Sequence, residues 1–201
     1  MMKIGVLALQ GAVREHVKSL QAPDCEVVIV KRVEQLNDLD GLVFPGGEST
    51  TMRRLVDKYG FFEALKEFSA SGKPMFGTCA GLILMAEDIS GQDQGHLQVM
   101  DMEVERNAFG RQRESFETTL PVLGVAEDIE AVFIRAPLIK NVGERVEILA
   151  EYNGEIVAAR QDNLLACSFH PELTTDIRFH QYFVQLVRES LESTEQPLAA
   201  T

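Results

Sequence analysis

Short apolar runs alternate with segments of helical spacing over the first 90 residues, and this alternation constrains the fold more than any other feature. The apolar runs lie at residues 3–9, 26–30, 41–44 and 74–77. Segments with apolar side chains at helical spacing follow at residues 12–20, 33–39, 49–59, 61–68 and 80–87, with Ser49 or Thr50 as the expected cap of the third. Strands joined through helices by short links become parallel neighbours, so the pattern predicts a parallel sheet covered on both faces.

The second half of the chain has a different pattern. Apolar and polar residues alternate over residues 96–104, 117–120 and 131–135. Two further apolar runs flank Tyr152-Asn153-Gly154-Glu155, which is a strong hairpin signal. These features predict antiparallel additions to the parallel sheet.

The C-terminal part returns to longer elements. A buried strand is expected at residues 164–169, followed by a long amphipathic helix at residues 174–191. We expect one α/β domain over residues 1–194, mostly parallel, with helices on both faces and antiparallel additions in the second half. Residues 195–201 are expected to fray.

Composition limits the class of protein. The 201 residues are 45% hydrophobic and carry a net charge of −12. Such acidity argues against a nucleic-acid binder, because phosphate binding needs a positive face. No apolar run reaches the roughly 20 residues that span a bilayer. Three unpatterned cysteines and no signal-like N-terminus predict a cytoplasmic protein without disulfides or membrane contact.

The strand predicted at residues 74–77 leads into Gly77-Thr78-Cys79-Ala80-Gly81 and then into a helical segment. A cysteine between two glycines at a strand-to-helix turn is the cysteine version of a nucleophile elbow. The N-terminus of the following helix favours a thiolate at the sulfur. Cys79 is therefore a candidate nucleophile, and the alternative is a small cysteine packed in the core.

A thiol nucleophile needs a base and a group that orients the base, and residues 168–172 offer both. His170 and Glu172 lie two positions apart after a predicted strand, so in extended backbone they face the same side. Active sites of open α/β sheets lie at the carboxyl ends of the strands, where Cys79 is also expected. A capping or core histidine is the alternative. Zinc binding by Cys167 and His170 is disfavoured, because no second ligand pair accompanies them.

Three more groups are candidates for the site. The sequence Pro45-Gly46-Gly47-Glu48-Ser49 has paired glycines that expose backbone N–H groups, as an oxyanion hole requires. Its alternative is an ordinary strand-to-helix turn. Arg106 and Arg135 each follow a predicted strand and have the geometry to hold a carboxylate, although most such arginines are surface residues. His16, His96 and His180 have no partner that the sequence identifies.

Together these segments resemble the class I (triad) glutamine amidotransferases. Six blocks resemble the branch that forms the glutaminase subunit of pyridoxal 5′-phosphate synthase: residues 4–16 (IGVLALQGAVREH), 44–51 (FPGGESTT), 76–84 (FGTCAGLIL), 106–117 (RNAFGRQRESFE), 132–137 (VFIRAP) and 168–173 (SFHPEL). The blocks span nearly the whole chain in order. The first and the fourth narrow the resemblance from the superfamily to this branch.

The resemblance implies a flavodoxin-like fold and a Cys-His-Glu triad at Cys79, His170 and Glu172. It implies that L-glutamine is contacted by Gly47, Glu48, Ser49, Arg106, Ile134 and Arg135. The expected reaction is attack by Cys79 on the glutamine amide, with the oxyanion near the backbone N–H groups of Gly47 and Ala80.

The resemblance also implies an obligate partner, the synthase subunit, which uses the ammonia to build the vitamin B6 cofactor. It implies no cofactor or metal for this chain. Gln10, Gly11 and the start of the helix at residues 12–20 are candidates for the partner face. The competing interpretations are a triad glutaminase of another pathway, an elbow-cysteine hydrolase of another class, and an inactive regulatory subunit with the same fold.

Overall fold

The computed structural model describes residues 1–109 and 115–195. In these ranges the strands are β1 (Met2–Leu7), β2 (Cys25–Val30), β3 (Gly41–Phe44), β4 (Met75–Thr78), β5 (Ala86–Ile89), β6 (Met100–Glu105), β7 (Ser115–Val122), β8 (Ala126–Ile134), β9 (Leu138–Val142), β10 (Glu147–Tyr152), β11 (Glu155–Gln161) and β12 (Leu164–Cys167). The helices are α1 (Val13–Ser19), α2 (Ser49–Lys58), α3 (Phe61–Ala70), α4 (Ala80–Met85) and α5 (Arg178–Glu195), with the 3₁₀ helices η1 (Val33–Asp38) and η2 (Pro171–Leu173).

The main sheet has a parallel half and a mixed half. Strands β2, β1, β3, β4 and β12 lie side by side in this order, and every neighbouring pair is parallel. The sheet continues from β12 to β11, β9, β6 and β5, with three antiparallel pairs and a final parallel pair. β10 pairs with β11, while β7 and β8 form a separate antiparallel ribbon. The predicted parallel sheet with antiparallel additions is confirmed.

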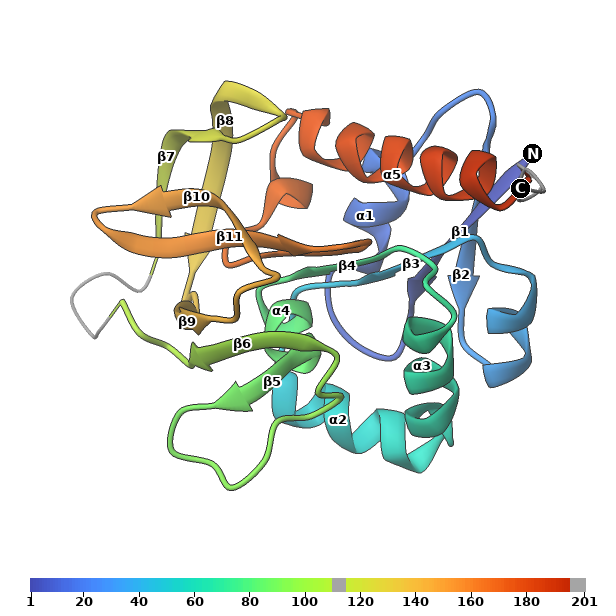
Figure 1. The fold of residues 1–201 in the computed structure, drawn as a ribbon, viewed down its shortest axis with the longest axis horizontal. Helices are drawn as coiled ribbons and strands as arrows, with labels where there is room; N and C mark the ends of the chain where they lie inside the picture. Colours follow the sequence, from blue (N-terminus) through green and yellow to red (C-terminus); the bar gives the residue numbers. More distant parts are fainter. Residues whose placement is uncertain (110–114, 196–201) are drawn as a thin grey trace, which may run out of the picture.

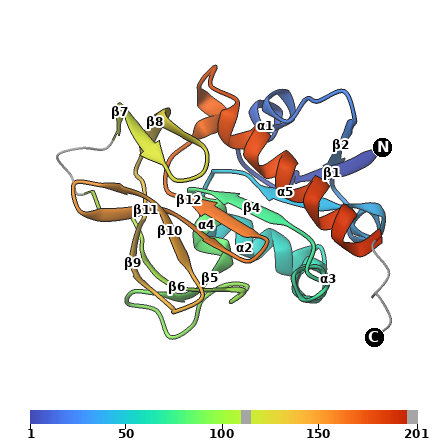
Figure 2. The same cartoon turned by 45° about the horizontal axis from the view of Figure 1, so that its top comes forward.

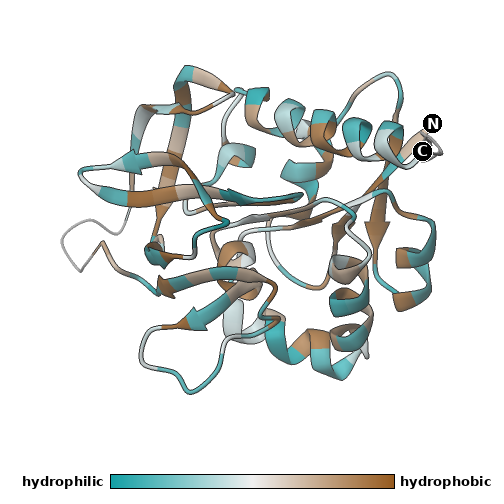
Figure 3. Ribbon diagram, in the orientation of Figure 1, coloured by the Kyte–Doolittle hydropathy of each residue, from teal (hydrophilic) through white to brown (hydrophobic). Residues whose placement is uncertain are grey.

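Helices cover both faces of the parallel strands, with α1 and α5 on one side and α2, α3 and α4 on the other (Figures 1 and 2). Successive residues of a strand point to opposite faces. Leu42 and Phe44 of β3 therefore belong to the core under α2 and α3, whereas Val43 belongs to the core under α5. The helices show mixed brown and teal bands in Figure 3, as expected for elements with one buried face. Among the described helices, none is long and apolar enough to span a bilayer.

Several predicted boundaries were wrong. The helix expected at residues 80–87 ends at Met85, because Ala86 and Ile89 pair with β6 and become buried in a strand. Tertiary pairing here overrides local helix propensity. The segment at residues 33–39 is a 3₁₀ helix, and β9 was not expected at all. Neither Ser49 nor Thr50 caps α2, because the Glu48 carboxylate accepts the N–H groups of the first turn.

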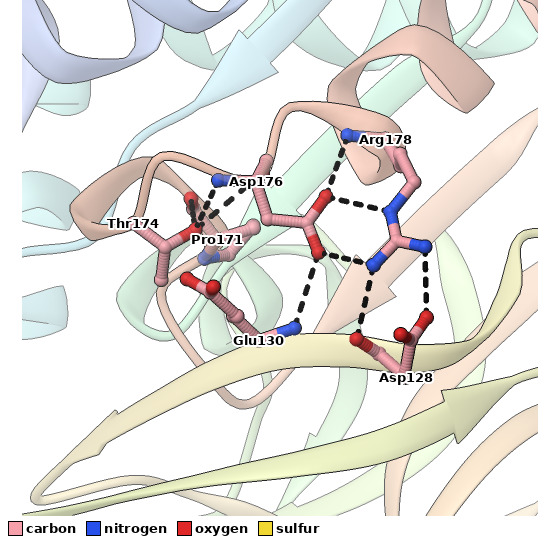
Figure 4. Close-up of polar contacts among 6 residues, drawn as sticks. All are labelled: Asp128, Glu130, Pro171, Thr174, Asp176 and Arg178. Carbon is pink, nitrogen blue, oxygen red and sulfur yellow. Dashed lines mark hydrogen bonds and ion pairs between the residues drawn. The ribbon is translucent and has the colours of Figure 1, made fainter.

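The last helix begins at Arg178, four residues later than predicted. Thr174 and Asp176 form a turn in which the Asp176 carboxylate accepts the Arg178 N–H at 3.1 Å (Figure 4). The Arg178 guanidinium binds Asp176 and reaches Asp128 of β8 at 2.8 Å, and these bonds hold the pKa of Asp176 at about 2. The cluster joins the start of α5 to β8. Of the predicted tail, residues 196–201 lie outside the described residues.

The junction between β4 and α4 is packed too closely for side chains. A Cβ at Gly77 would lie 2.5 Å from the carbonyl carbon of Gly81, and a Cβ at Gly81 would lie 2.3 Å from the carbonyl oxygen of Phe44. Real Cβ atoms do not approach backbone atoms so closely, so both positions require glycine. The helix can therefore start directly behind Cys79 and lie against β3 and β4.

We expect Gly81→Ala to lower the free energy of unfolding by about 2 kcal/mol or more, because the added methyl group forces backbone apart in a packed core. Gly91→Ala is the matched control. Gly91 has a φ of 78° but open space around it, so only a conformational cost of about 1 kcal/mol is expected. Denaturant unfolding of both variants measures the difference, and equal losses would contradict the packing argument.

Candidate active site

Cys79 occupies a strained turn between β4 and α4. Its φ of 50° and ψ of −103° are unusual for a residue with a side chain. Its N–H donates to the Cys167 carbonyl at 2.8 Å, and its carbonyl accepts the Ile83 N–H of α4 at 3.2 Å. Hydrogen bonds on both sides thus hold the strained residue, and the strand-turn-helix context predicted for a nucleophile elbow is confirmed.

His170 and Glu172 lie beside Cys79 because β12 is the parallel neighbour of β4. Thr78 and Cys167 are paired at the ends of these strands. His170 Nδ1 lies 2.7 Å from Glu172 Oε1, and the His170 N–H donates to the Val132 carbonyl. The route to this contact differs from the prediction. Residues 170–172 are not extended, because Pro171 starts η2 and this turn brings Glu172 back to the imidazole.

An open cleft of about 520 Å³ lies in front of Cys79 and His170. Its lining contains most of the residues that the sequence singled out: Gly47, Glu48, Ser49, Cys79, Arg106, Ile134, Arg135 and His170. Glu172 is 4% exposed and does not line the cleft, since it lies behind the His170 ring. Ala80 is also buried and outside the lining, as the first residue of α4. The cleft therefore presents a sulfur and an imidazole to a small molecule.

The loop after β3 is shaped by its contacts with both neighbours. A Cβ at Gly46 would lie 2.3 Å from Cε1 of His170, so only glycine lets the ring pack here. The Gly46 carbonyl accepts the Ala12 N–H at 3.0 Å, and the Glu48 N–H donates to Gln10 Oε1 at 2.9 Å. Gly47 itself is exposed to the cleft. Residues from the β1–α1 turn thus set the course of this loop.

Glu48 and Ser49 lie at the start of α2. The Glu48 carboxylate accepts hydrogen bonds from Thr51 and from the backbone of Thr50, which lower its pKa to about 2. Arg106 Nη2 lies 3.5 Å from the same carboxylate. The Ser49 hydroxyl is buried and has no hydrogen-bond partner among the described residues. Glu48 therefore acts as a helix cap that also faces Arg106.

The opposite wall of the cleft contains Ile134 and Arg135 at the end of β8. The Ile134 carbonyl lies 3.9 Å from the Cys79 sulfur. Arg135 has a φ of 44°, and Asn107 beside it in the cleft has a φ of 52°. Arg135 is exposed and makes no ion pair within residues 1–109 and 115–195. It is a cation available to a bound anion. Residues 110–114 of the block at residues 106–117 lie outside the described part of the chain.

Comparison with known proteins identifies the family. The profile of the SNO glutamine amidotransferase family matches residues 6–189. The chain belongs to this family. The resemblance and the fold class expected from the sequence are thereby confirmed.

Relatives of known name cover almost the whole chain. A protein named pyridoxal 5′-phosphate synthase subunit PdxT from Halalkalibacterium halodurans is 73% identical over 190 residues, which cover 94% of this chain and 97% of that protein. The protein of the same name from a Geobacillus species is 66% identical, covering 94% and 99%. A solved glutamine amidotransferase structure matches with a TM-score of 0.87 at 46% identity, covering 92% and 98%. A GMP synthase structure from Thermoplasma acidophilum shares only the fold, at 18% identity over 98% of each chain and a TM-score of 0.68.

The four histidines of this amidotransferase lie in opposite electrostatic environments. Burial disfavours the charged form of His170, but bonds and charges from Cys79 and Glu172 outweigh it and raise its pKa to about 10. Burial lowers the pKa of His180 to about 4. Burial lowers the pKa of His16 well below the usual value and that of His96 to a lesser degree. At pH 7, His170 is therefore the charged histidine of the four.

Two functional candidates were missed at the sequence level. His16 was expected near an exposed partner face, but it is completely buried, as is His180. His16 Nδ1 lies 2.9 Å from His180 Nε2, and His16 Nε2 lies 3.1 Å from Thr78 Oγ1. The residues are separated by up to 164 positions, so no spacing in the sequence indicates the contact. The two other cysteines play no part in the cleft: Cys25 is half-buried, and Cys167 is buried with its sulfur against the Phe169 carbonyl.

We expect one histidine, His170, to titrate with a midpoint near pH 10, while the other three stay neutral from pH 7 upward. The raised pKa of His170 stabilises the folded state fully below about pH 6.5, and this stabilisation is lost as the pH rises toward 10. NMR of the protein labelled at its histidine rings measures all four titrations. A His170 midpoint at or below pH 7 would contradict the ion-pair geometry at this site.

Proposed function

We propose that this chain is a glutaminase that releases ammonia from L-glutamine through a thioester at Cys79. The observation that carries the proposal is the strained elbow cysteine placed beside the bonded His170–Glu172 pair, at the wall of an open cleft. Membership of a glutamine amidotransferase family supports the substrate. Catalytic roles fall to Cys79 as nucleophile, His170 as acid and base, and Glu172 as the group that orients His170.

The reaction follows from these positions. The Cys79 thiolate attacks the side-chain amide carbon of glutamine, and the carbonyl electrons move onto oxygen. His170 gives its proton to the amide nitrogen, the carbon–nitrogen bond breaks, and ammonia leaves. Water, deprotonated by His170, then attacks the thioester, and glutamate leaves as the thiolate re-forms. Glu172 keeps the imidazole in the tautomer whose Nε2 faces the cleft and stabilises the imidazolium.

The tetrahedral oxyanion needs hydrogen-bond donors where its charge develops. The backbone N–H groups of Gly47 and Ala80 are our candidates, since Gly47 is exposed in the cleft and Ala80 directly follows the nucleophile. Removing one such donor costs roughly 10²–10³ in turnover. The bond from the Glu48 N–H to Gln10 holds the peptide next to Gly47, so Gln10 influences how this donor is aimed.

The ends of glutamine require charged partners. We assign its α-carboxylate to the Arg135 guanidinium, which has no ion pair in the described residues. Arg106 and Glu48 lie together on the other side of the cleft and provide a cation and an anion for the amino-acid end. Ser49 and Ile134 complete the wall, where the buried Ser49 hydroxyl lacks a partner among the described residues. Glutamine is thus held along a line from these residues to Cys79.

The partner is inferred from the relatives. Proteins named pyridoxal 5′-phosphate synthase subunit PdxT match this chain at 60–73% identity. We therefore propose that the chain is the glutaminase subunit of that synthase, and that it passes ammonia to a synthase subunit in vitamin B6 biosynthesis. The proposed location is the cytoplasm. Gln10 and Gly11 border both the cleft and the surface, which supports a partner face around the β1–α1 turn.

We expect Cys79→Ala to abolish glutamate formation from glutamine while the circular dichroism spectrum stays unchanged, because only the nucleophile is lost. Cys25→Ala is the matched control and should keep full activity. The assay is run with the purified chain by itself and in the presence of the synthase subunit. Residual turnover by Cys79→Ala at the wild-type rate would contradict the proposal, and activity indifferent to the synthase subunit would contradict the assigned partner.

We expect Arg135→Gln to raise the KM for glutamine about 10-fold or more, because a charge-assisted hydrogen bond worth about 1.5–3 kcal/mol is lost. The rate at saturating glutamine should change much less, because Arg135 touches the end of the substrate that does not react. Arg54→Gln, an exposed arginine outside the cleft, is the control. An unchanged KM for Arg135→Gln would place the carboxylate elsewhere.

A further inference from the structure

A buried line of hydrogen bonds leads away from the site behind Glu172. His180 Nε2 lies 2.9 Å from His16 Nδ1, His16 Nε2 lies 3.1 Å from Thr78 Oγ1, and Thr78 Oγ1 lies 3.5 Å from Glu172 Oε1. The line joins α5, α1, β4 and η2, four elements that are distant in the sequence. None of His180, His16 and Thr78 lines the cleft. No step of the glutaminase reaction uses them.

All the members are removed from solvent. His16, His180 and Thr78 have no exposed surface, and the Glu172 side chain is likewise fully buried. Polar groups in such surroundings are costly unless they are hydrogen-bonded to one another. A core of this kind could have been filled by apolar side chains. Its polar character at this place points to a purpose connected with Glu172.

The three donors converge on a single oxygen. Glu172 Oε1 lies 2.7 Å from His170 Nδ1, 3.5 Å from Thr78 Oγ1 and 3.6 Å from His16 Nε2. The other oxygen, Oε2, has no partner among the described residues. His16 is neutral, because burial and the neighbouring histidines lower its pKa and disfavour its charged form. Its contact with Glu172 is therefore that of a dipole with a carboxylate and not that of an ion pair.

One assignment of protons satisfies the line best. If His180 donates through Nε2 and His16 donates through Nε2, every hydrogen bond points toward the carboxylate. The leftover group is then the unprotonated His180 Nδ1, which has no partner among the described residues. The reverse assignment leaves a buried N–H donor without an acceptor, which is rarer in proteins than an unpaired acceptor. Aligned donors also polarise one another and strengthen the bond to the carboxylate.

We propose that His16, supported by His180 and acting through Thr78, is a positioning residue that fixes the Glu172 carboxylate in the orientation that holds His170. The inference rests on the proposed glutaminase function for its kinetic consequence but not for its structural one. Without the line, only His170 would hold Glu172, and the carboxylate would rotate toward its unpartnered side. His170 would then lose part of its counter-charge and its fixed tautomer.

Other titratable groups also face this carboxylate. His170 contacts it directly, His16 approaches it from α1, and the Cys167 thiol of β12 interacts with it, burial being the main cause of the raised pKa of that thiol. Cys79 interacts with both His170 and Cys167. Cys167 is a neutral thiol in this core. Changes in the His170 titration after removal of His16 therefore report on Glu172 and Cys79 and not on another charged neighbour.

The test compares His16→Leu, which removes the donor, with His16→Gln, whose side-chain amide can donate from the position of Nε2. Leu20→Ala is the matched control, because it removes packing from the end of α1 but leaves the line intact. Long-range nitrogen NMR of the wild-type protein is expected to show His16 and His180 as neutral rings protonated at Nε2. A ring of His16 protonated at Nδ1 would overturn the proposed direction of the line.

The same variants are then followed by the His170 titration, which needs no glutamine turnover. We expect His16→Leu to lower the His170 midpoint, His16→Gln to restore it, and Leu20→Ala to leave it unchanged while reducing stability. An unchanged or raised midpoint in His16→Leu, or a Leu20→Ala shift of equal size, would overturn the proposal. Failure of the glutaminase function alone would leave this result intact, so the two claims are tested separately.

Kinetics supply the second readout. His16→Leu should lower kcat roughly 10-fold, as is typical for loss of an outer-shell partner, with little change in the KM for glutamine. Thr78→Val keeps the shape of the side chain and removes the hydroxyl, so it serves where His16→Leu does not fold. Because both changes break one line, their effects on kcat should be far from additive in the double variant. Additive losses, or a change confined to KM, would contradict a shared positioning role.

Discussion

The parallel pairing of β4 with β12 is the interaction on which the whole site depends. Four residue pairs, from Met75 with Leu164 to Thr78 with Cys167, set these strands in register at the centre of the sheet. The bond from the Cys79 N–H to the Cys167 carbonyl extends this ladder one residue beyond the strand end. Cys79 and the His170 turn therefore emerge at the same edge of the sheet. A shift of register by one residue would turn their side chains to opposite faces.

Close packing converts this register into a fixed geometry. The Gly77–Gly81 contact sets α4 directly behind Cys79, and Gly46 gives room to the His170 ring. The aromatic core under α5 continues up to the buried histidines, with the Phe76 ring 6.4 Å from His16 and 5.7 Å from His180. A dry, closely packed surrounding of this kind strengthens each hydrogen bond that ends on Glu172. The apolar core and the polar line thus serve the same carboxylate.

Local patterns in the sequence were enough to predict the parallel half of the sheet, the hairpin at Asn153 and Gly154, and the elbow at Cys79. Apolar runs, glycines and strand ends carry these signals within a few residues. The H-x-E spacing indicated the His170–Glu172 contact, although through an extended backbone that Pro171 prevents. Contacts between distant segments were out of reach. β5 and β9 depend on pairing with β6, and His16 meets His180 only after α1 and α5 have packed on the same face.

The most direct test of the central claim is to identify the residue that forms the covalent bond. A diazoketone analogue of glutamine, which alkylates a nucleophile placed at the amide carbon, is incubated with the protein and the labelled peptide is found by mass spectrometry. The account predicts one adduct on Cys79, slowed by glutamine, with Cys25 and Cys167 unlabelled. Labelling of another residue, or labelling that glutamine does not slow, would contradict it.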